Sequence, residues 1–321
     1  MLRAVPGLQL AAQFTHYAGH AKEMCTGLTR KDYDLVIAVG GDGTVNEVVN
    51  GLLGTADHAP NANNIPALAV IPTGSANVFV RALGFPPEPV EATKALVDTI
   101  RHNKRRMIDV GTWDDQWFVV NVGFGLDAEV ISKMERARQR GFSATPLRYI
   151  RLTARAWRQA HRRPPSIAVT ATDSSGNSVS VKQLPICFAS NTNPWTFFGP
   201  LPVVTNPRNS FDVGLGIFGL TSLDGVAGIV AMLQMLGANL PPQVQRWLNK
   251  RVFIFDDAMK VQLECAETQA FQVDGEFAGE MDAVELGAVA NALEVFAPTE
   301  TIQPTPMSWI RLGLSFFDLR L

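Results

Sequence analysis

At 321 residues, the chain is too long for one ordinary core and of the right length for two domains. Hydrophobic residues make up 46% and charged residues 18% of the sequence, which is typical of a globular protein and excludes a disordered one. The net charge of −2 predicts no general affinity for nucleic acid.

The cysteines and the apolar runs restrict the cellular setting. Cys25, Cys187 and Cys265 are far apart and form no CxxC pair, which argues against a disulfide framework and a zinc site. No signal peptide is recognised at the N-terminus. The longest apolar run, near residues 226–236, is much shorter than the ~20 residues that cross a bilayer. We therefore expect a cytoplasmic protein whose contact with a membrane, if any, is peripheral.

Two early segments show the same order of a buried strand, a glycine-rich turn and a helix. Residues 34–39 are a continuous apolar, β-branched run, which breaks at residues 40–43 and continues with helical spacing up to Gly51. Residues 67–71 form a second such run, which breaks at residues 72–76. A helix then follows from Val78 to a C-cap at Gly84. This repetition predicts an α/β domain built on a doubly wound parallel sheet.

After Asp109 the pattern changes to short alternating strands separated by Gly, Pro, Asn and Asp, which predicts a mostly antiparallel β domain with a few helices. The strands are predicted at 117–122, 167–172, 184–189, 211–218, 251–255, 260–263 and 271–273, and the helices near 143–162 and 222–237. The predicted domains are a nucleotide-binding domain over 1–114 and a β-rich domain over 115–300. A C-terminal tail, 301–321, is expected to pack back on the body.

The first turn has the chemistry of an anion site. Where a strand ends in glycines and leads into a helix, the backbone can approach phosphate oxygens and the helix N-terminus offers unpaired N–H groups. Gly40, Gly41 and Gly43 provide the glycines, and Asp42 adds a carboxylate that suits a bridging Mg²⁺ or a ribose. Thr44 is expected at or near the N-cap. The alternative is a tight turn with an Asp N-cap and no ligand.

The second turn strengthens the nucleotide interpretation. In a parallel sheet both turns emerge at the same edge, where ligands bind. The hydroxyls of Thr73 and Ser75, together with Gly74 and Asn77, would converge there with the first turn. Neither turn is a Walker A loop, and neither matches the dinucleotide fingerprint G-x-G-x-x-G.

Residues 39–52 followed by 71–81 resemble the diacylglycerol kinase catalytic family, whose superfamily also contains sphingosine, ceramide and NAD kinases. The pattern Asn-Glu-x-x-Asn-Gly over 46–51 favours the lipid branch. Residues 191–196 and 272–276 extend the resemblance to the stand-alone bacterial members, especially the actinobacterial type.

The resemblance implies a two-domain fold with ATP in the cleft between the domains. It assigns phosphate binding to Gly41, Asp42, Gly43 and Thr44, supported by Thr73, Gly74 and Asn77. It also implies that Glu276 is the base that accepts the proton of the lipid hydroxyl, with Asp42 as the second catalytic residue. The alternative for Asp274-Gly275 is a plain hairpin turn, and the two interpretations are compatible because a rigid turn could present Glu276 to the cleft.

The chain departs from the family pattern in two places. Family members usually begin with a strand that ends in an Asn-Pro-x-Ala/Ser-Gly loop, and no such sequence precedes residue 35. Residues 8–14 resemble the family's second strand instead, so the nucleotide-binding domain is expected to lack the first strand and loop. In the family's Asp-rich stretch Asp212 is retained as a weak metal candidate, but Gly216 stands where a second Asp is common.

A basic helix is predicted from spacing. The arginines at 148, 151, 155, 158 and 162 step by three and four residues, which places them along one helix face. Arg148, Arg151, Arg155 and Arg158 are therefore predicted to contact an anionic membrane, and a solvated face is the alternative.

Together these observations predict an ATP- and Mg²⁺-dependent lipid kinase that phosphorylates diacylglycerol or a related lipid, with a role in phospholipid biosynthesis. Its partner would be a lipid substrate at the membrane surface, on the inner face of the plasma membrane, and not nucleic acid. The alternatives are a kinase for a sphingoid or other long-chain alcohol, and a catalytically inactive homologue that binds nucleotide or lipid.

Overall fold

The computed structural model describes residues 1–124, 164–198, 201–223 and 251–298. Its helices are α1 (His20–Cys25), α2 (Asp42–Leu53), α3 (Val78–Ala82) and α4 (Pro89–Arg101), with short 3-10 turns at Leu2–Ala4, Ala56–His58 and Ala62–Asn64. The first strands are β1 (Leu35–Gly40), β2 (Ala67–Pro72), β3 (Arg105–Trp113), β4 (Gln116–Phe118), β5 (Asn121–Phe124), β6 (Ile167–Asp173) and β7 (Ser178–Leu184). The remaining strands are β8 (Ile186–Ser190), β9 (Thr196–Phe198), β10 (Leu201–Val203), β11 (Leu215–Leu220), β12 (Val252–Val273) and β13 (Glu276–Phe296).

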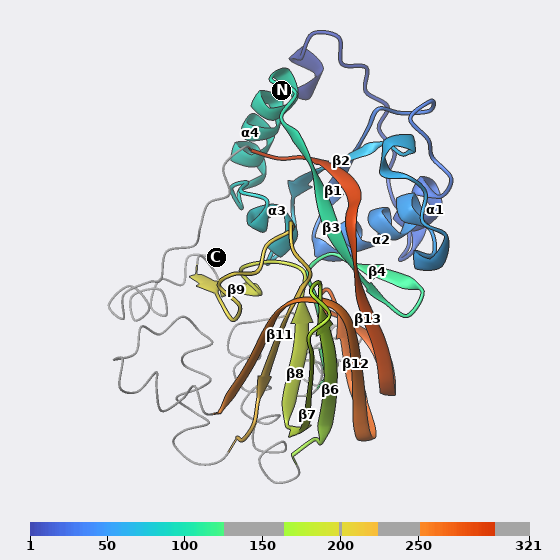
Figure 1. The fold of residues 1–321 in the computed structure, drawn as a ribbon. Helices are drawn as coiled ribbons and strands as arrows, with labels where there is room; N and C mark the ends of the chain where they lie inside the picture. Colours follow the sequence, from blue (N-terminus) through green and yellow to red (C-terminus); the bar gives the residue numbers. More distant parts are fainter. Residues whose placement is uncertain (125–163, 199–200, 224–250, 299–321) are drawn as a thin grey trace.

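The N-terminal part is the predicted α/β unit. β1 and β2 pair in parallel and in register, from Leu35 opposite Ala67 to Gly40 opposite Pro72, so both strands end at the same edge. Every residue of β2 is buried, as its continuous apolar run predicts. Figure 1 shows α1 and α2 on one side of these strands and α3 and α4 on the other. The glycine-rich turns therefore leave the sheet side by side.

Apart from one parallel contact between β13 and β2, the rest of the sheet is antiparallel, as predicted. Its strand order is β1-β2-β13-β12-β11-β8-β5, with β3 and β4 joined through β13, and β6 and β7 joined through β12. A separate small hairpin pairs β9 with β10. The predicted fold class, parallel strands near the N-terminus followed by a larger antiparallel region, is confirmed.

Three of the predicted strands are one strand. The predicted segments 251–255, 260–263 and 271–273 all lie in β12, which runs without a break through the polar residues between them. Its pairing partners shift register between Glu264 and Gln269, so an irregularity replaces the expected turn. β13 and β3 were not predicted, and β13 is rich in Ala and Gly, which are depleted in strands and hide its alternation.

β13 joins the two halves of the molecule. Its first residues pair with β12, while its last residues pair antiparallel with β3 and, at Val295 opposite Leu68, in parallel with β2. One sheet therefore runs through the boundary predicted near residue 114 (Figure 1). Two hydrophobic cores form on this sheet, one around α2, β2 and α3 and one around β5, β6, β8 and β12.

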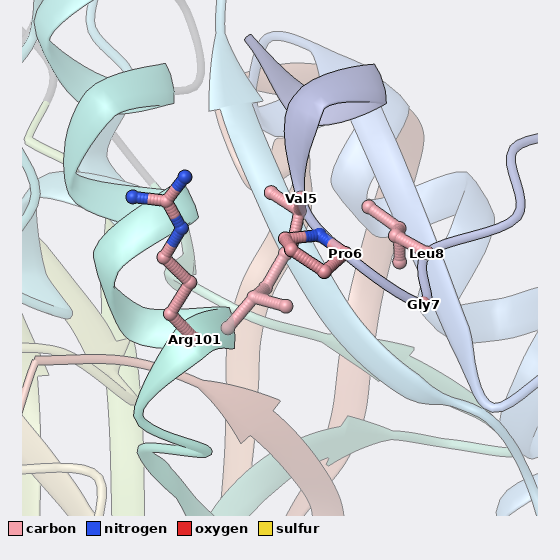
Figure 2. Close-up of a pocket in the computed structure, with 6 residues that line it drawn as sticks. Val5, Pro6, Gly7, Leu8 and Arg101 are labelled. Carbon is pink, nitrogen blue, oxygen red and sulfur yellow. The ribbon is translucent and has the colours of Figure 1, made fainter.

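Residues 8–14, expected to be a strand, form none. Among the described residues β1 is the end strand of the sheet order, and residues 8–14 do not pair with it. Phe14 is 79% exposed as a result. A hollow of about 530 Å³ lies between Val5, Pro6, Gly7 and Leu8 and the Ile100 and Arg101 end of α4 (Figure 2), and no predicted site residue lines it.

Several predictions fall outside the described residues. They are the helices near 143–162 and 222–237, the tail from 301 to 321, and the proposed membrane contacts Arg148, Arg151, Arg155 and Arg158. None of the helices in the described ranges is long and apolar enough to cross a bilayer.

Candidate active site

The two glycine-rich turns touch each other through their backbones. The N–H of Thr73 donates to the carbonyl oxygen of Gly40 at 3.0 Å, which extends the parallel pairing one residue past the strands. A Cβ on Gly74 would lie 2.6 Å from the Cα of Gly41, closer than side chains approach a backbone. Glycine at both positions is therefore required for this contact, and together the turns form a single surface.

The second turn is closed by its own asparagine. Asn77 adopts a left-handed backbone conformation (φ 50°), and its side chain both accepts the N–H of Gly74 at 2.9 Å and donates to the Gly74 carbonyl at 2.8 Å. Asn77 is buried, whereas Thr73, Gly74 and Ser75 are exposed. The turn thus has a fixed shape with two hydroxyl-bearing residues at its surface.

Asp42 connects the first turn to α3. One carboxylate oxygen accepts the N–H of Val78 and the other that of Phe79, both at 3.0 Å, so Asp42 caps the helix that follows the second turn. Burial raises the pKa of Asp42, partly offset by these two N–H groups and by the positive charge of Arg81. A carboxylate has about four acceptor sites, more than the N–H groups of Val78 and Phe79 use, so a cation can still bind it.

Arg81 was not predicted as a site residue. Its guanidinium lies 3.4 Å from the centroid of the Phe197 ring in β9, a cation–π contact between α3 and the small hairpin. Burial lowers the pKa of Arg81 to about 10, and the neighbouring Asp42 carboxylate opposes that shift. The only sequence signal was a charge at the end of a short apolar helix.

Thr44, expected at or near the N-cap, lies near it but is not the N-cap itself. α2 begins at Asp42 with Gly41 as its N-cap, so Thr44 lies inside the first turn of the helix. Its side chain folds back toward the end of β1, where a Cβ on Gly40 would lie 2.5 Å from Thr44 Oγ1. Glycine at 40 makes room for that side chain, which is why the helix can start earlier than the apolar spacing suggests.

Glu276 lies against the first turn although it is 233 residues further along the chain than Gly43. A Cβ on Gly43 would collide with its carboxylate. The geometry therefore brings together the carboxylate predicted as the base and the N-terminal turn of α2 predicted to hold phosphate.

The predicted hairpin turn before Glu276 is confirmed. Asp274 (φ 50°) and Gly275 (φ 82°) are both left-handed, and Val273 pairs with Glu276 across the turn. This combination is typical of a two-residue type I′ turn. The turn places Glu276 beside Gly43, so the plain structural interpretation is compatible with the functional one.

Asp274 anchors that turn to the rest of the molecule. Its carboxylate accepts the three consecutive N–H groups of Val119, Val120 and Asn121 at 2.7–3.0 Å, and the side-chain amide of Asn46 at 2.8 Å. Burial raises the pKa of Asp274 to about 6, and the four donors oppose the rise. Asp274 thus fixes the turn that carries Glu276 to α2 and to the start of β5.

The Asn-Glu-x-x-Asn-Gly pattern holds α2 in place. Asn46 and Asn50 lie on one face of α2 and donate to the carbonyl of Trp117, both at 3.0 Å. Glu47 accepts the N–H groups of Gly19 and Ala21 at the start of α1. The spacing of four residues between the asparagines was a signal that the sequence offered for this role.

Gly51 is buried where α1 crosses α2, and it gives a test of this structural role. A Cβ at this position would collide with the carbonyl oxygen of Lys22 and the side chain of Cys25. We expect Gly51→Ala to lower the free energy of unfolding by about 1–3 kcal/mol, because backbone must move to admit the methyl group. Urea unfolding followed by fluorescence measures the loss. A variant as stable as the wild type would show that the helices do not pack in this way.

Asp212, the weak metal candidate, forms an ion pair with the side chain of Arg106. Its carboxylate lies 3.4 Å from the Arg106 guanidinium and is largely exposed. A Cβ on Gly216 would lie 3.0 Å from the side chains of Asn206 and Asn209, so these asparagines occupy the space that a carboxylate there would need. Within the described ranges no three His, Cys, Asp or Glu side chains gather as metal ligands.

The N-terminal part of the chain is similar to a known family of catalytic domains. Residues 3–113 match the family model of the diacylglycerol kinase catalytic domain. This segment contains both glycine turns and Asp42. The N-terminal third of the chain is therefore similar to the diacylglycerol kinase catalytic domain.

The relatives of this segment are named as kinases of more than one lipid. The diacylglycerol kinase of Bacillus subtilis is 41% identical over 133 residues, which cover 40% of this chain and 41% of that protein. Sphingosine kinase 1 of Arabidopsis thaliana is 35% identical over 139 residues, 42% of this chain and 28% of that protein. The chain thus matches about two fifths or less of the length of these relatives.

The likeness in structure extends further than the likeness in sequence. A crystal structure of a diacylglycerol kinase from Bacillus anthracis superposes with a TM-score of 0.61 at 21% identity, over 90% of this chain and 85% of that one. At this identity the match shows the fold alone. The two chains therefore share a fold over most of their lengths.

Proposed function

We propose that this protein transfers the γ-phosphoryl group of ATP to the hydroxyl of diacylglycerol or a related lipid. The observation that carries the proposal is the contact of Glu276 with Gly43 at the N-terminus of α2. A phosphate-binding helix start and a carboxylate that can accept a proton are the two parts that phosphoryl transfer to an alcohol requires. The catalytic-domain match and the lipid kinases among its relatives support this function.

The residues present fit a Mg²⁺ ion that arrives with ATP. Mg²⁺ is commonly held by one or two carboxylates together with substrate phosphates rather than by a protein cage. Asp42 is the carboxylate of the first turn, so it would hold the ion. When bound, Mg²⁺ would neutralise charge on the phosphates.

The chain's own groups have distinct tasks in this proposal. The glycine surface at residues 40–43 and 73–74 lets phosphates approach the backbone, and the first N–H groups of α2 point at them. Glu276 would orient the lipid hydroxyl and accept its proton. Because a loose phosphoryl-transfer transition state deprotonates the alcohol late, the position of Glu276 should matter more than its basicity.

Asp42→Asn tests the phosphate side of the site. We expect kcat to fall by at least about 100-fold, because the neutral amide cannot hold the cation that offsets phosphate charge. The loss of one cap acceptor for α3 should cost only about 1 kcal/mol of unfolding free energy. Asp57→Asn, at an exposed position in the same domain, is the matched control and should keep full activity. Wild-type turnover by Asp42→Asn would refute the proposed role.

The substrate is identified with labelled ATP, Mg²⁺ and mixed micelles that contain diacylglycerol, sphingosine, ceramide or another long-chain alcohol. Incorporation into diacylglycerol is the expected result. A sphingoid or other long-chain alcohol is the second candidate, because one relative is named a sphingosine kinase. No incorporation into any of these lipids would favour a catalytically inactive homologue that binds nucleotide or lipid and would overturn the proposal.

A further inference from the structure

We infer that Gln272 is a positioning residue that sets the place of Glu276 through a chain of buried amides. This inference rests on the proposed function, because it assigns Gln272 a role in the same reaction. Gln272 lies in β12 two residues before Asp274, the first residue of the turn, and its side chain is fully buried. An apolar side chain of similar volume would fill that space without any need for partners.

Both ends of the Gln272 amide are occupied. Its Oε1 accepts the N–H of Gly275 at 2.9 Å, inside the turn that carries Glu276. Its Nε2 donates to Oδ1 of Asn121 at 2.6 Å. Asn121 is also buried, and its Nδ2 donates to the carbonyl of Trp195 at 3.0 Å.

The two fixed ends of this chain determine its direction. The N–H of Gly275 can only donate, so the Gln272 atom that faces it must be oxygen. The Trp195 carbonyl can only accept, so the Asn121 atom that faces it must be nitrogen. Each amide can then take only one orientation, and the chain runs from the turn to the segment at 191–196 that leads into β9.

The amide chain complements the anchor at Asp274. Asp274 ties the first residue of the turn to residues 119–121, and Gln272 ties its second residue, Gly275, to Asn121 and Trp195. Both residues of the turn are thus held by buried hydrogen bonds that involve side chains, in addition to the backbone hydrogen bonds between β12 and β13. Glu276 follows directly, so a shift of the turn becomes a shift of its carboxylate relative to Gly43.

The first test compares two replacements of Gln272. Gln272→Met keeps the volume and removes both hydrogen bonds, so kcat should fall about 10- to 100-fold while the KM for ATP stays within about twofold, because only the base is misplaced. Gln272→Glu keeps the shape. When protonated it can still accept from Gly275 and donate to Asn121, but when ionised it cannot donate. Its kcat relative to the wild type should therefore fall as the pH rises, since burial raises the pKa of a carboxyl group.

A structural control separates positioning from simple loss of stability. Thr112→Val removes a buried hydroxyl on β3, outside the amide chain, and should leave kcat at the wild-type value. Protection of the Gly275 amide against hydrogen exchange, read by NMR, measures the turn without any assay of activity. We expect that protection to fall in Gln272→Met and to be unchanged in Thr112→Val.

The outcomes are distinguishable. Wild-type kcat in Gln272→Met, or unchanged protection of the Gly275 amide, would overturn the positioning role. A kcat for Gln272→Glu that follows the wild type at every pH would also overturn it. If the wild-type protein phosphorylates no lipid at all, the proposed function fails instead, and the protection of Gly275 alone then decides whether Gln272 holds the turn.

Discussion

Replacement of Asp274 by alanine should be among the most destabilising single changes in this protein. The substitution leaves three buried N–H groups without an acceptor, those of Val119, Val120 and Asn121, and it takes from the part-buried amide of Asn46 one of its two acceptors. An unsatisfied buried donor costs about 1–3 kcal/mol, and losses within one network are not additive. We expect the free energy of unfolding to fall by about 3–5 kcal/mol.

Urea unfolding followed by the fluorescence of tryptophan measures this loss, because Trp117 is fully buried next to the network. Asp282→Ala on the exposed face of β13 is the matched control and should change the free energy by less than about 0.5 kcal/mol. Equal stability of Asp274→Ala and Asp282→Ala would show that Asp274 does not anchor the turn.

The same carboxylate predicts a dependence of stability on pH. Burial raises the pKa of Asp274 to about 6, above the value of about 3.9 expected in the unfolded chain. Between those values the folded state binds more protons than the unfolded state, so this contribution to stability is complete below pH ~4 and is lost as the pH rises through ~6. The difference in unfolding free energy between the wild type and Asp274→Asn should therefore shrink from pH 4 to pH 7. A difference that grows over this range would contradict the assignment.

Gly43→Ala should abolish most of the activity without loss of stability. The new methyl group would occupy the place of the Glu276 carboxylate, which is the end of a flexible side chain and can turn away at little cost. Alanine is also preferred over glycine in a helix by about 1 kcal/mol, and residue 43 lies in the first turn of α2. We expect unchanged or raised thermal stability and a kcat lower by about 100-fold, the usual contribution of a positioned base.

Initial rates of lipid phosphorylation and a thermal melt on the same preparation measure the two effects together. The combination is diagnostic, because a substitution that merely damages the fold lowers activity and stability in parallel. If Gly43→Ala keeps wild-type kcat, Glu276 does not act from the position seen here.

Much of the N-terminal part could be predicted from sequence because its signals are local. β1 and β2 are continuous apolar runs and each ends at glycine or proline, so strand, turn and helix appear in a short window. The Asp274-Gly275 turn is equally local, since the residue pair itself favours a left-handed turn. The contact between the two glycine turns followed from the parallel pairing of their strands.

The rest depends on contacts that no local pattern contains. β13 has a weak strand sequence, and its pairing with β2 and β3 joins residues that are more than 170 positions apart. The start of α2 at Asp42 follows from the space that Gly40 leaves for Thr44. The roles of Asn46 and Asn50 became visible only when Trp117 and Asp274 were placed beside them. Long-range hydrogen bonds of this kind leave no periodic trace in a sequence.

The proposed catalytic site depends on the contact between Gly43 and Glu276. A double-mutant cycle measures the coupling between these two residues. Initial rates of lipid phosphorylation are compared for the wild type, Gly43→Ala, Glu276→Gln and the double variant. If the methyl group acts only by displacing the carboxylate, each single variant should lose about 100-fold and the double variant no more than either one. Losses that multiply to about 10⁴-fold in the double variant would mean that the two residues act independently and would contradict the site described here.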